Sequence, residues 1–162
     1  DNFGFASYGK PAAVLHQLRA MLGDVTFFTA FRRYAADWAF KHPTPYDFFR
    51  TFSEVAGVDL EPYFRTWMFE TWQLDHAVQD VVEANGKTVV AIEDRGRAMH
   101  FAEVEVTYRD GATARQTVPV SLWQKSHFAR LTFGKDVVKV AIDPDTGSLD
   151  CVRSNNVWPS KQ

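Results

Sequence analysis

The sequence has 162 residues, a formal net charge of −2, and 15% aromatic residues. This length suits one large domain or two small ones. The near-neutral charge excludes a basic nucleic-acid-binding module and a surface built to attract anionic lipid. No apolar run approaches the roughly 20 residues that a helix needs to cross a bilayer, so no membrane span is expected.

The first half of the chain has helical periodicity. Gly23 and Gly57 each follow an apolar-periodic stretch and are expected to end a helix, and Thr44 is expected to cap the helix that Pro45 begins. These signals predict four helices, at residues 11–22, 25–41, 45–56 and about 59–68.

The second half changes to the period of β-strands. Asn85-Gly86 lies between two apolar runs and is a strong hairpin signal. Val104, Val106 and Tyr108 alternate with polar residues and so share one strand face. Six strands are predicted directly, at residues 77–83, 88–92, 101–108, 114–120, 128–133 and 137–142. Regularly spaced short strands with turn residues between them favour an antiparallel β-sandwich of about seven strands.

The predicted fold class is therefore α+β, with about four helices followed by the β-sandwich. The boundary is placed near Leu74, which gives a helical part at residues 1–73 and a β-sandwich domain at residues 74–162. The chain opens on Asp1 and not on Met, so we expect a fragment of a longer protein.

The predicted helices are unusually rich in aromatic residues, with eleven Phe and three Trp before residue 73. Small domains bury only a modest fraction of their surface, so four short helices cannot hide that many rings. Each exposed ring forgoes roughly 1.5–3 kcal/mol of burial. We expect these helices to pack against something more. The missing part of a larger fold is the economical candidate, and a homodimer through the exposed apolar helices is the alternative.

An ordered series of segments resembles the zinc aminopeptidases of the aminopeptidase N and leukotriene hydrolase type, which are gluzincin metallopeptidases. The series begins with a Tyr-x-Lys segment that opens a helix, here Tyr8-Gly9-Lys10, and a Leu-Gly stop at Leu22-Gly23. It continues with an Asp-Phe helix and a Gly-x-Asp-Leu segment that leads to a Trp. Here these pieces are Asp47-Phe48, Gly57-Val58-Asp59-Leu60 and Trp67.

The resemblance implies that residues 1–73 are the helical part of a thermolysin-like catalytic domain. It also implies that the hydroxyl of Tyr8 points at the substrate carbonyl, where it stabilises the tetrahedral oxyanion. One such donor is typically worth about 2.7–4 kcal/mol. Read from the residues alone, Tyr8 packs at a helix entrance, and Lys10 pairs with a carboxylate outside the chain or is solvated.

In the family, zinc is held by the two histidines of an H-E-x-x-H motif and by a glutamate on the next helix. No pair of histidines here has the i, i+4 spacing of that motif; they are His16, His42, His76, His100 and His127. We therefore expect the zinc ligands to lie outside this chain, and the histidines to be surface or cap residues. The single cysteine, Cys151, is expected to be a small, partly buried apolar side chain, with a reactive thiol as the alternative.

The resemblance makes the parent protein a zinc metallopeptidase that trims amino-terminal residues from peptides. Its partners are then the upstream catalytic domain of the same parent chain and a peptide substrate, and the fragment alone is expected to be inactive. Two alternatives stay open. The parent is a peptidase-like scaffold without catalysis, or the β half is an independent carbohydrate- or protein-binding module, because sandwiches carry many functions.

Overall fold

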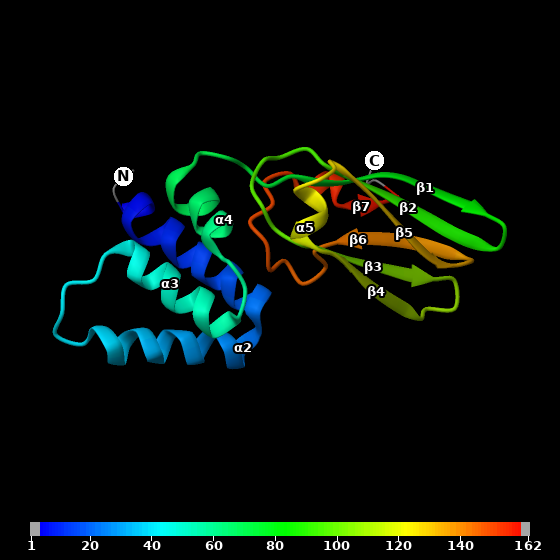
Figure 1. The fold of residues 1–162 in the computed structure, drawn as a ribbon. Coiled ribbons are helices and arrows are strands. Elements are labelled where there is room, and N and C mark those ends of the chain that lie inside the picture. Colours follow the sequence, from blue (N-terminus) through cyan, green and yellow to red (C-terminus); the bar gives the residue numbers. More distant parts are fainter. Residues whose placement is uncertain (1–3, 160–162) are drawn as a thin grey trace. The chain divides into compact units, whose positions relative to one another are not determined.

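The structure is a computed structural model that describes residues 4–159, so Asp1 lies outside the described residues. The chain divides between Thr71 and Trp72 into two compact parts, which we call unit 1 and unit 2. Unit 1 is helical, and unit 2 contains two antiparallel sheets with seven strands in total (Figure 1). The predicted α+β class is confirmed.

Unit 1 consists of two long helical elements and three short ones. Its elements are the π-helical turn η1 (Phe5–Gly9), α2 (Lys10–Trp38), α3 (Pro45–Ala56), α4 (Glu61–Phe64) and the π-helical turn η2 (Arg65–Phe69). Gly23 has φ 75° and ψ 159°, so α2 is two helical segments that meet at this residue. The predicted break at Gly23 is confirmed, because a left-handed φ is accessible to glycine at little cost.

Both ends of α3 are determined by local capping. The carboxylate of Asp47 accepts hydrogen bonds from the backbone N–H of Thr44 at 2.9 Å and from its hydroxyl at 2.8 Å. These bonds hold the pKa of Asp47 below its usual value. Gly57 ends the helix with φ 67°. The predicted start and stop of this helix are both confirmed.

Replacing Thr44 with alanine is expected to lower the free energy of unfolding of unit 1 by about 1 kcal/mol, since the capping box at the start of α3 loses the Thr44 hydroxyl. Denaturant unfolding followed by far-UV circular dichroism measures the change. Thr29→Ala is the matched control, because Thr29 lies inside α2 and is exposed. It is expected to change stability by less than about 0.5 kcal/mol. Equal losses in the two variants would show that the cap contributes nothing.

The core of unit 1 is built from packed rings. Phe64 is fully buried and stacks on Phe49 with ring centroids 4.3 Å apart, and Phe52 contacts Phe27 at 5.5 Å. Many other aromatic side chains of this unit stay exposed. They are Tyr8, Phe28, Phe31, Phe40, Tyr46 and Phe69. Unit 1 thus buries one cluster of rings and leaves a second set at its surface.

Unit 2 has one sheet of three strands and one of four. The sheet orders are β1-β2-β5 and β4-β3-β6-β7. The strands are β1 (His76–Ala84), β2 (Lys87–Asp94), β3 (Ala102–Tyr108), β4 (Thr113–Val118), β5 (Phe128–Gly134), β6 (Val137–Ile142) and β7 (Val157–Trp158). Asn85 and Gly86 both have positive φ, as the tight turn of the predicted β1–β2 hairpin requires.

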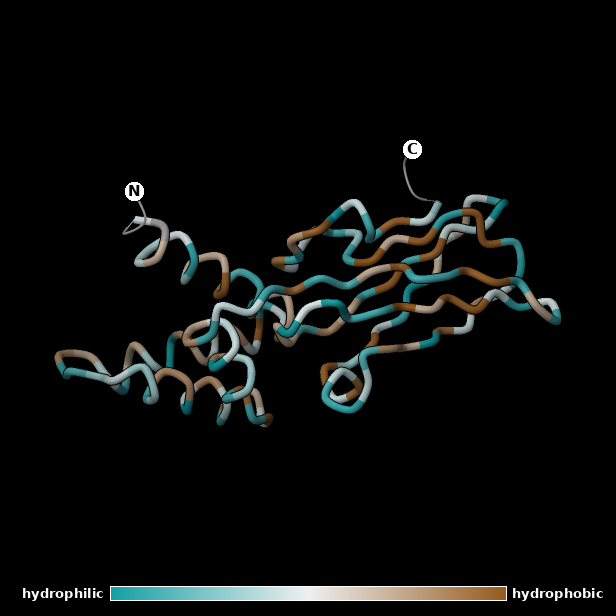
Figure 2. The backbone as a smooth tube through the Cα atoms, turned by 90° about the horizontal axis from the view of Figure 1, so that it is seen from above, coloured by the Kyte–Doolittle hydropathy of each residue, from teal (hydrophilic) through white to brown (hydrophobic). Residues whose placement is uncertain are grey.

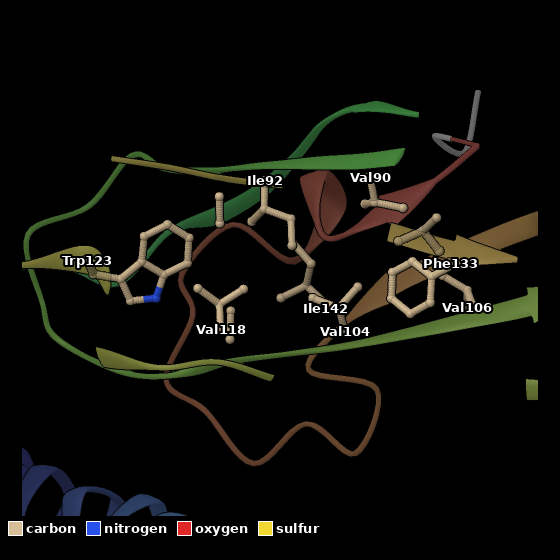
Figure 3. Close-up of a cluster of buried hydrophobic side chains, with 11 residues drawn as sticks. Val90, Ile92, Val104, Val106, Val118, Trp123, Phe133 and Ile142 are labelled. Atoms are coloured by element: carbon tan, nitrogen blue, oxygen red, sulfur yellow. The ribbon is translucent and has the colours of Figure 1, made fainter. Parts of the chain in front are cut away.

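One hydrophobic core is shared by the two sheets. Val90 and Ile92 enter it from β2, and Val104 and Val106 enter it from β3 (Figure 3). Trp123 closes one end of the cluster from the short helix α5 (Val120–Trp123). Figure 2 shows hydrophobic and hydrophilic stretches following one another along the strands of this unit. This alternation matches the side chains that the strands turn toward and away from the shared core.

Two features of unit 2 differ from the sequence-based expectation. The strand predicted at residues 114–120 ends at Val118, and the chain then forms α5, which was not predicted. β7 was also not predicted, because a two-residue strand carries no periodicity; it is recognised only by its pairing with β6.

Candidate functional site

Tyr8 lies in the π-helical turn η1, immediately before α2. Pro11 occupies the first turn of α2, where it suits the helix because the missing N–H would have no partner there. The Tyr8 side chain is 72% exposed and forms no hydrogen bond with any of residues 4–159. Its phenol O–H is therefore free of the described part of the chain and can be donated to a ligand.

Lys10 joins the start of α2 to the end of η2. Its Nζ donates a 3.4 Å hydrogen bond to the backbone carbonyl oxygen of Glu70. The carboxylate of Glu70 in turn lies 3.5 Å from Nε of Arg65. The sequence left Lys10 either paired with a carboxylate outside the chain or solvated. The structure instead shows it bonded to a backbone carbonyl within unit 1.

An exposed pair of rings lies beside this junction. Tyr46, in the first turn of α3, and Phe69, next to Glu70, stack with centroids 6.2 Å apart and an interplanar angle of 14°. Phe69 also contacts the buried Phe49 edge-on at 6.0 Å. The sequence analysis did not predict this pair of residues. The one signal that pointed toward it was that the predicted helices carry more aromatic rings than a small domain can bury. The starts of α2 and α3 and the end of η2 thus meet at one end of unit 1.

Tyr63 provides a contrast with Tyr8. It is buried, its hydroxyl donates to the Val14 carbonyl oxygen at 2.8 Å, and it accepts a 3.1 Å hydrogen bond from Nε2 of Gln17. Burial raises the pKa of Tyr63 above its ordinary value. Its hydroxyl therefore serves the packing of unit 1, whereas the Tyr8 hydroxyl forms no hydrogen bond with the described residues.

Among the described residues, no group of three or more His, Cys, Asp or Glu side chains could hold a metal ion. His16, His42 and His127 are exposed, as expected for surface or cap residues. The same expectation was wrong for His76 and His100, which are buried in unit 2: the His76 ring packs on Trp123 and the His100 ring packs on Phe101.

Cys151 is exposed, and the expectation that it is partly buried was wrong. Its Sγ lies 3.9 Å from Oε1 of Gln73. Partial desolvation and the nearby carboxylates of Asp75 and Asp150 raise the pKa of the Cys151 thiol. Because the thiolate is the nucleophile, this environment does not activate the residue.

No protein-family model and no curated protein sequence matches the chain. Among solved structures, it is similar to the crystal structure of Legionella pneumophila aminopeptidase A in complex with aspartic acid, with a TM-score of 0.63 and 17% sequence identity. The two chains share a fold. The aligned region covers 85% of this chain and 16% of aminopeptidase A. Neither unit alone makes up 85% of the chain, so the aligned residues come from both units.

The likeness to aminopeptidase A bears on fold and not on any single residue. This chain spans only 16% of the length of that enzyme. The assignment of Tyr8 as a catalytic residue therefore stays a prediction, as does the assignment of residues 1–73 to a thermolysin-like domain. Within residues 4–159, no helix is long and apolar enough to cross a membrane.

Proposed function

We propose that this chain is the carboxy-terminal part of a zinc-dependent aminopeptidase of the aminopeptidase N and leukotriene hydrolase type. Three observations support the proposal, and two of them are the ordered motif series of the sequence and the fold shared with part of an aminopeptidase. The observation that carries it is the exposure of Tyr8 in a π-helical turn just before a long helix. Single π-turns are frequent at functional sites.

In this proposal Tyr8 donates its hydroxyl proton in a hydrogen bond to the oxyanion that develops when water adds to the scissile carbonyl. A donor aimed at the oxyanion, and not at the ground-state oxygen, stabilises the transition state selectively. The bond between Lys10 and the Glu70 carbonyl ties the chain just after Tyr8 to η2. We infer that this tie positions the turn that carries the phenol.

Zinc is proposed for the parent protein and not for this chain. The described residues offer no set of ligands that fits a zinc ion, so we place the ligands outside this chain and derive no step through the metal. The upstream catalytic domain of the same parent chain is the proposed partner. The exposed rings of unit 1 supply apolar area for it to cover, and a peptide is the proposed substrate.

The proposal is tested by comparing the full-length parent with the 162-residue chain. The parent is expected to hydrolyse an aminoacyl reporter, to lose that activity on chelation, and to regain it when zinc is added. The isolated chain is expected to be inert under the same conditions. An inactive zinc-loaded parent would contradict the proposed peptidase, and would favour the scaffold alternative. Zinc-dependent turnover by the isolated chain would contradict the proposed division of labour.

A further inference from the structure

Two buried histidines lie in unit 2, apart from the site proposed above. His76 is the first residue of β1, and His100 lies in the segment between β2 and β3; they are 2% and 3% exposed. Nε2 of each ring is buried and has no hydrogen-bond partner among the described residues. Nδ1 of His100 lies 2.6 Å from the carbonyl oxygen of Phe101. Each ring therefore leaves one nitrogen without a bond in the interior, which is costly.

The His76 ring has an apolar neighbour and a constrained backbone. It stacks on the indole of Trp123 with centroids 5.1 Å apart and an interplanar angle of 28°. Its backbone N–H donates to Oδ2 of Asp150 at 2.9 Å. The indole Nε1 of Trp123 is itself buried without a partner in the described part of the chain. The two rings are thus packed for contact area, and neither supplies the other with a hydrogen bond.

Residues 73–76, which end at His76 and which we call the 73–76 segment, are held by backbone hydrogen bonds from two other segments. The carbonyl oxygen of Gln73 accepts from the N–H groups of Arg97 at 3.0 Å and Ala98 at 3.1 Å. That of Leu74 accepts from the N–H of Cys151 at 3.0 Å. A Cβ added to Gly96 would lie 2.2 Å from the Gln73 carbonyl oxygen, so the fit leaves no spare room.

The charges around His76 partly oppose one another. Burial is the strongest influence and, together with the neighbouring His100, lowers the pKa of His76 to about 4. The carboxylates of Asp75 and Asp143 act in the opposite direction. Asp94 of β2 lies opposite His76 of β1 in the strand register. Burial raises the pKa of Asp94 to about 6. The Asp150 carboxylate holds the His76 backbone.

The surroundings of His100 contain both signs of charge. Burial lowers its pKa most strongly, and the positive charge of Arg153 acts in the same direction. The Phe101 carbonyl and the carboxylate of Asp143 oppose this shift. The same Asp143 carboxylate is bonded to Arg153, and its negative charge acts to raise the pKa of both rings.

We propose that His76 and His100 form an acid-sensitive latch: the neutral rings keep the 73–76 segment closed, and their protonation releases it while the sheets persist. The latch does not rest on the proposed peptidase function. Protonation places a charge in an apolar contact with Trp123, and that charge is relieved most directly if the ring leaves the interior. The 73–76 segment moves with it because His76 is its last residue.

The direction of the pH dependence follows from the two states. A released histidine has a pKa near 6.5, whereas burial lowers the pKa of His76 to about 4. The closed state is therefore fully favoured above pH 6.5. As the pH falls toward 4 it loses up to about tenfold per pH unit through His76, and His100 acts in the same direction. Asp94 acts oppositely below about pH 6, since the closed state holds its proton more tightly. Below about pH 6 the Asp94 proton offsets much of the His76 effect, whereas the lowered pKa of His100 adds to it, so the closed state still weakens on acidification.

The test uses the 162-residue chain, with NMR titration of the histidine rings and amide hydrogen exchange from pH 7.5 to 4.5, corrected for the intrinsic pH dependence. His76 is expected to titrate below pH 5. Exchange of amides in residues 73–78 and 98–101 is expected to rise about threefold or more between pH 7 and 5, whereas amides in β3 change little. A His76 that titrates near 6.5, or exchange that rises equally everywhere, would overturn the latch.

Variants separate the latch from a general effect of acid. His76→Phe keeps a ring against Trp123 and removes the titrating group, so the selective rise in exchange is expected to shrink. His42→Phe, at an exposed histidine of unit 1, is expected to keep the full rise, whereas His127 is unsuitable as a control because its charge acts on Asp94. If His76→Phe does not fold, the wild-type ring titration decides alone. An undiminished rise in a folded His76→Phe would also overturn the proposal.

Discussion

Replacing Tyr8 with phenylalanine in the intact parent protein is expected to lower kcat about 10²–10³-fold, with little change in KM. The substitution keeps the ring and removes only the hydroxyl, and the proposed hydrogen bond forms mainly in the transition state. The Tyr8 hydroxyl bonds to none of residues 4–159, so the folded chain loses no described interaction. Steady-state kinetics on an aminoacyl reporter measure kcat and KM, and a thermal melt of the same preparation checks that stability is unchanged.

Tyr63→Phe is the matched control for this prediction. It also removes a tyrosine hydroxyl, but one that is buried and hydrogen-bonded to Gln17 and the Val14 carbonyl. It is expected to lower the free energy of unfolding by about 1 kcal/mol or more, because Val14 and Gln17 lose a buried partner. It is expected to leave kcat within a few-fold of the value for the unsubstituted parent protein. Full activity in Tyr8→Phe, or equal kinetic losses in both variants, would remove Tyr8 from the proposed mechanism.

Replacing Phe64 with alanine is expected to destabilise unit 1 by about 3–5 kcal/mol. Phe64 is fully buried and contacts the rings of Phe48, Phe49 and Phe52, with its closest centroid at 4.3 Å. Its removal leaves a cavity that the surrounding rings fill only in part. Urea unfolding followed by far-UV circular dichroism reports the loss of helical signal from unit 1.

Phe40→Ala is the same chemical change at the opposite extreme of burial. Phe40 is fully exposed, so its truncation removes no described packing. It is expected to change the stability of the 162-residue chain by less than about 0.5 kcal/mol. A large loss for Phe40→Ala in this chain would mean that the residue is covered by a second copy, as in the homodimer alternative. Loss of self-association in that variant, measured by light scattering, would identify such a contact.

Local signals were sufficient for much of the fold. The hydrogen bonds that cap α3 join Thr44 to Asp47, three residues away, and the glycines at 23 and 57 have the left-handed φ that ends a helix. The turn at Asn85-Gly86 likewise depends on its own two residues. Interactions between residues that are a few positions apart can be recognised from the sequence alone. These predictions were confirmed for that reason.

Other features depend on partners that are distant in the sequence. His76 is buried by Trp123 and by the segment around Asp150, and nothing beside it in the chain indicates this. β7 exists through its pairing with β6, and the exposure of Cys151 became visible only in the folded chain. Hydrophobic patterning places a residue on an element, but burial is decided by what packs over that element.

Tyr8 shows most clearly which properties the sequence reveals and which depend on the tertiary structure. Its residue type and its place before a helix could be recognised in the sequence, through the resemblance to the aminopeptidases. Whether its hydroxyl is available was decided in three dimensions, where Tyr63 is buried beneath the packed helices and Tyr8 is not. The physical reason is that the chain dictates local backbone geometry, whereas solvent exposure depends on every element that could cover a side chain.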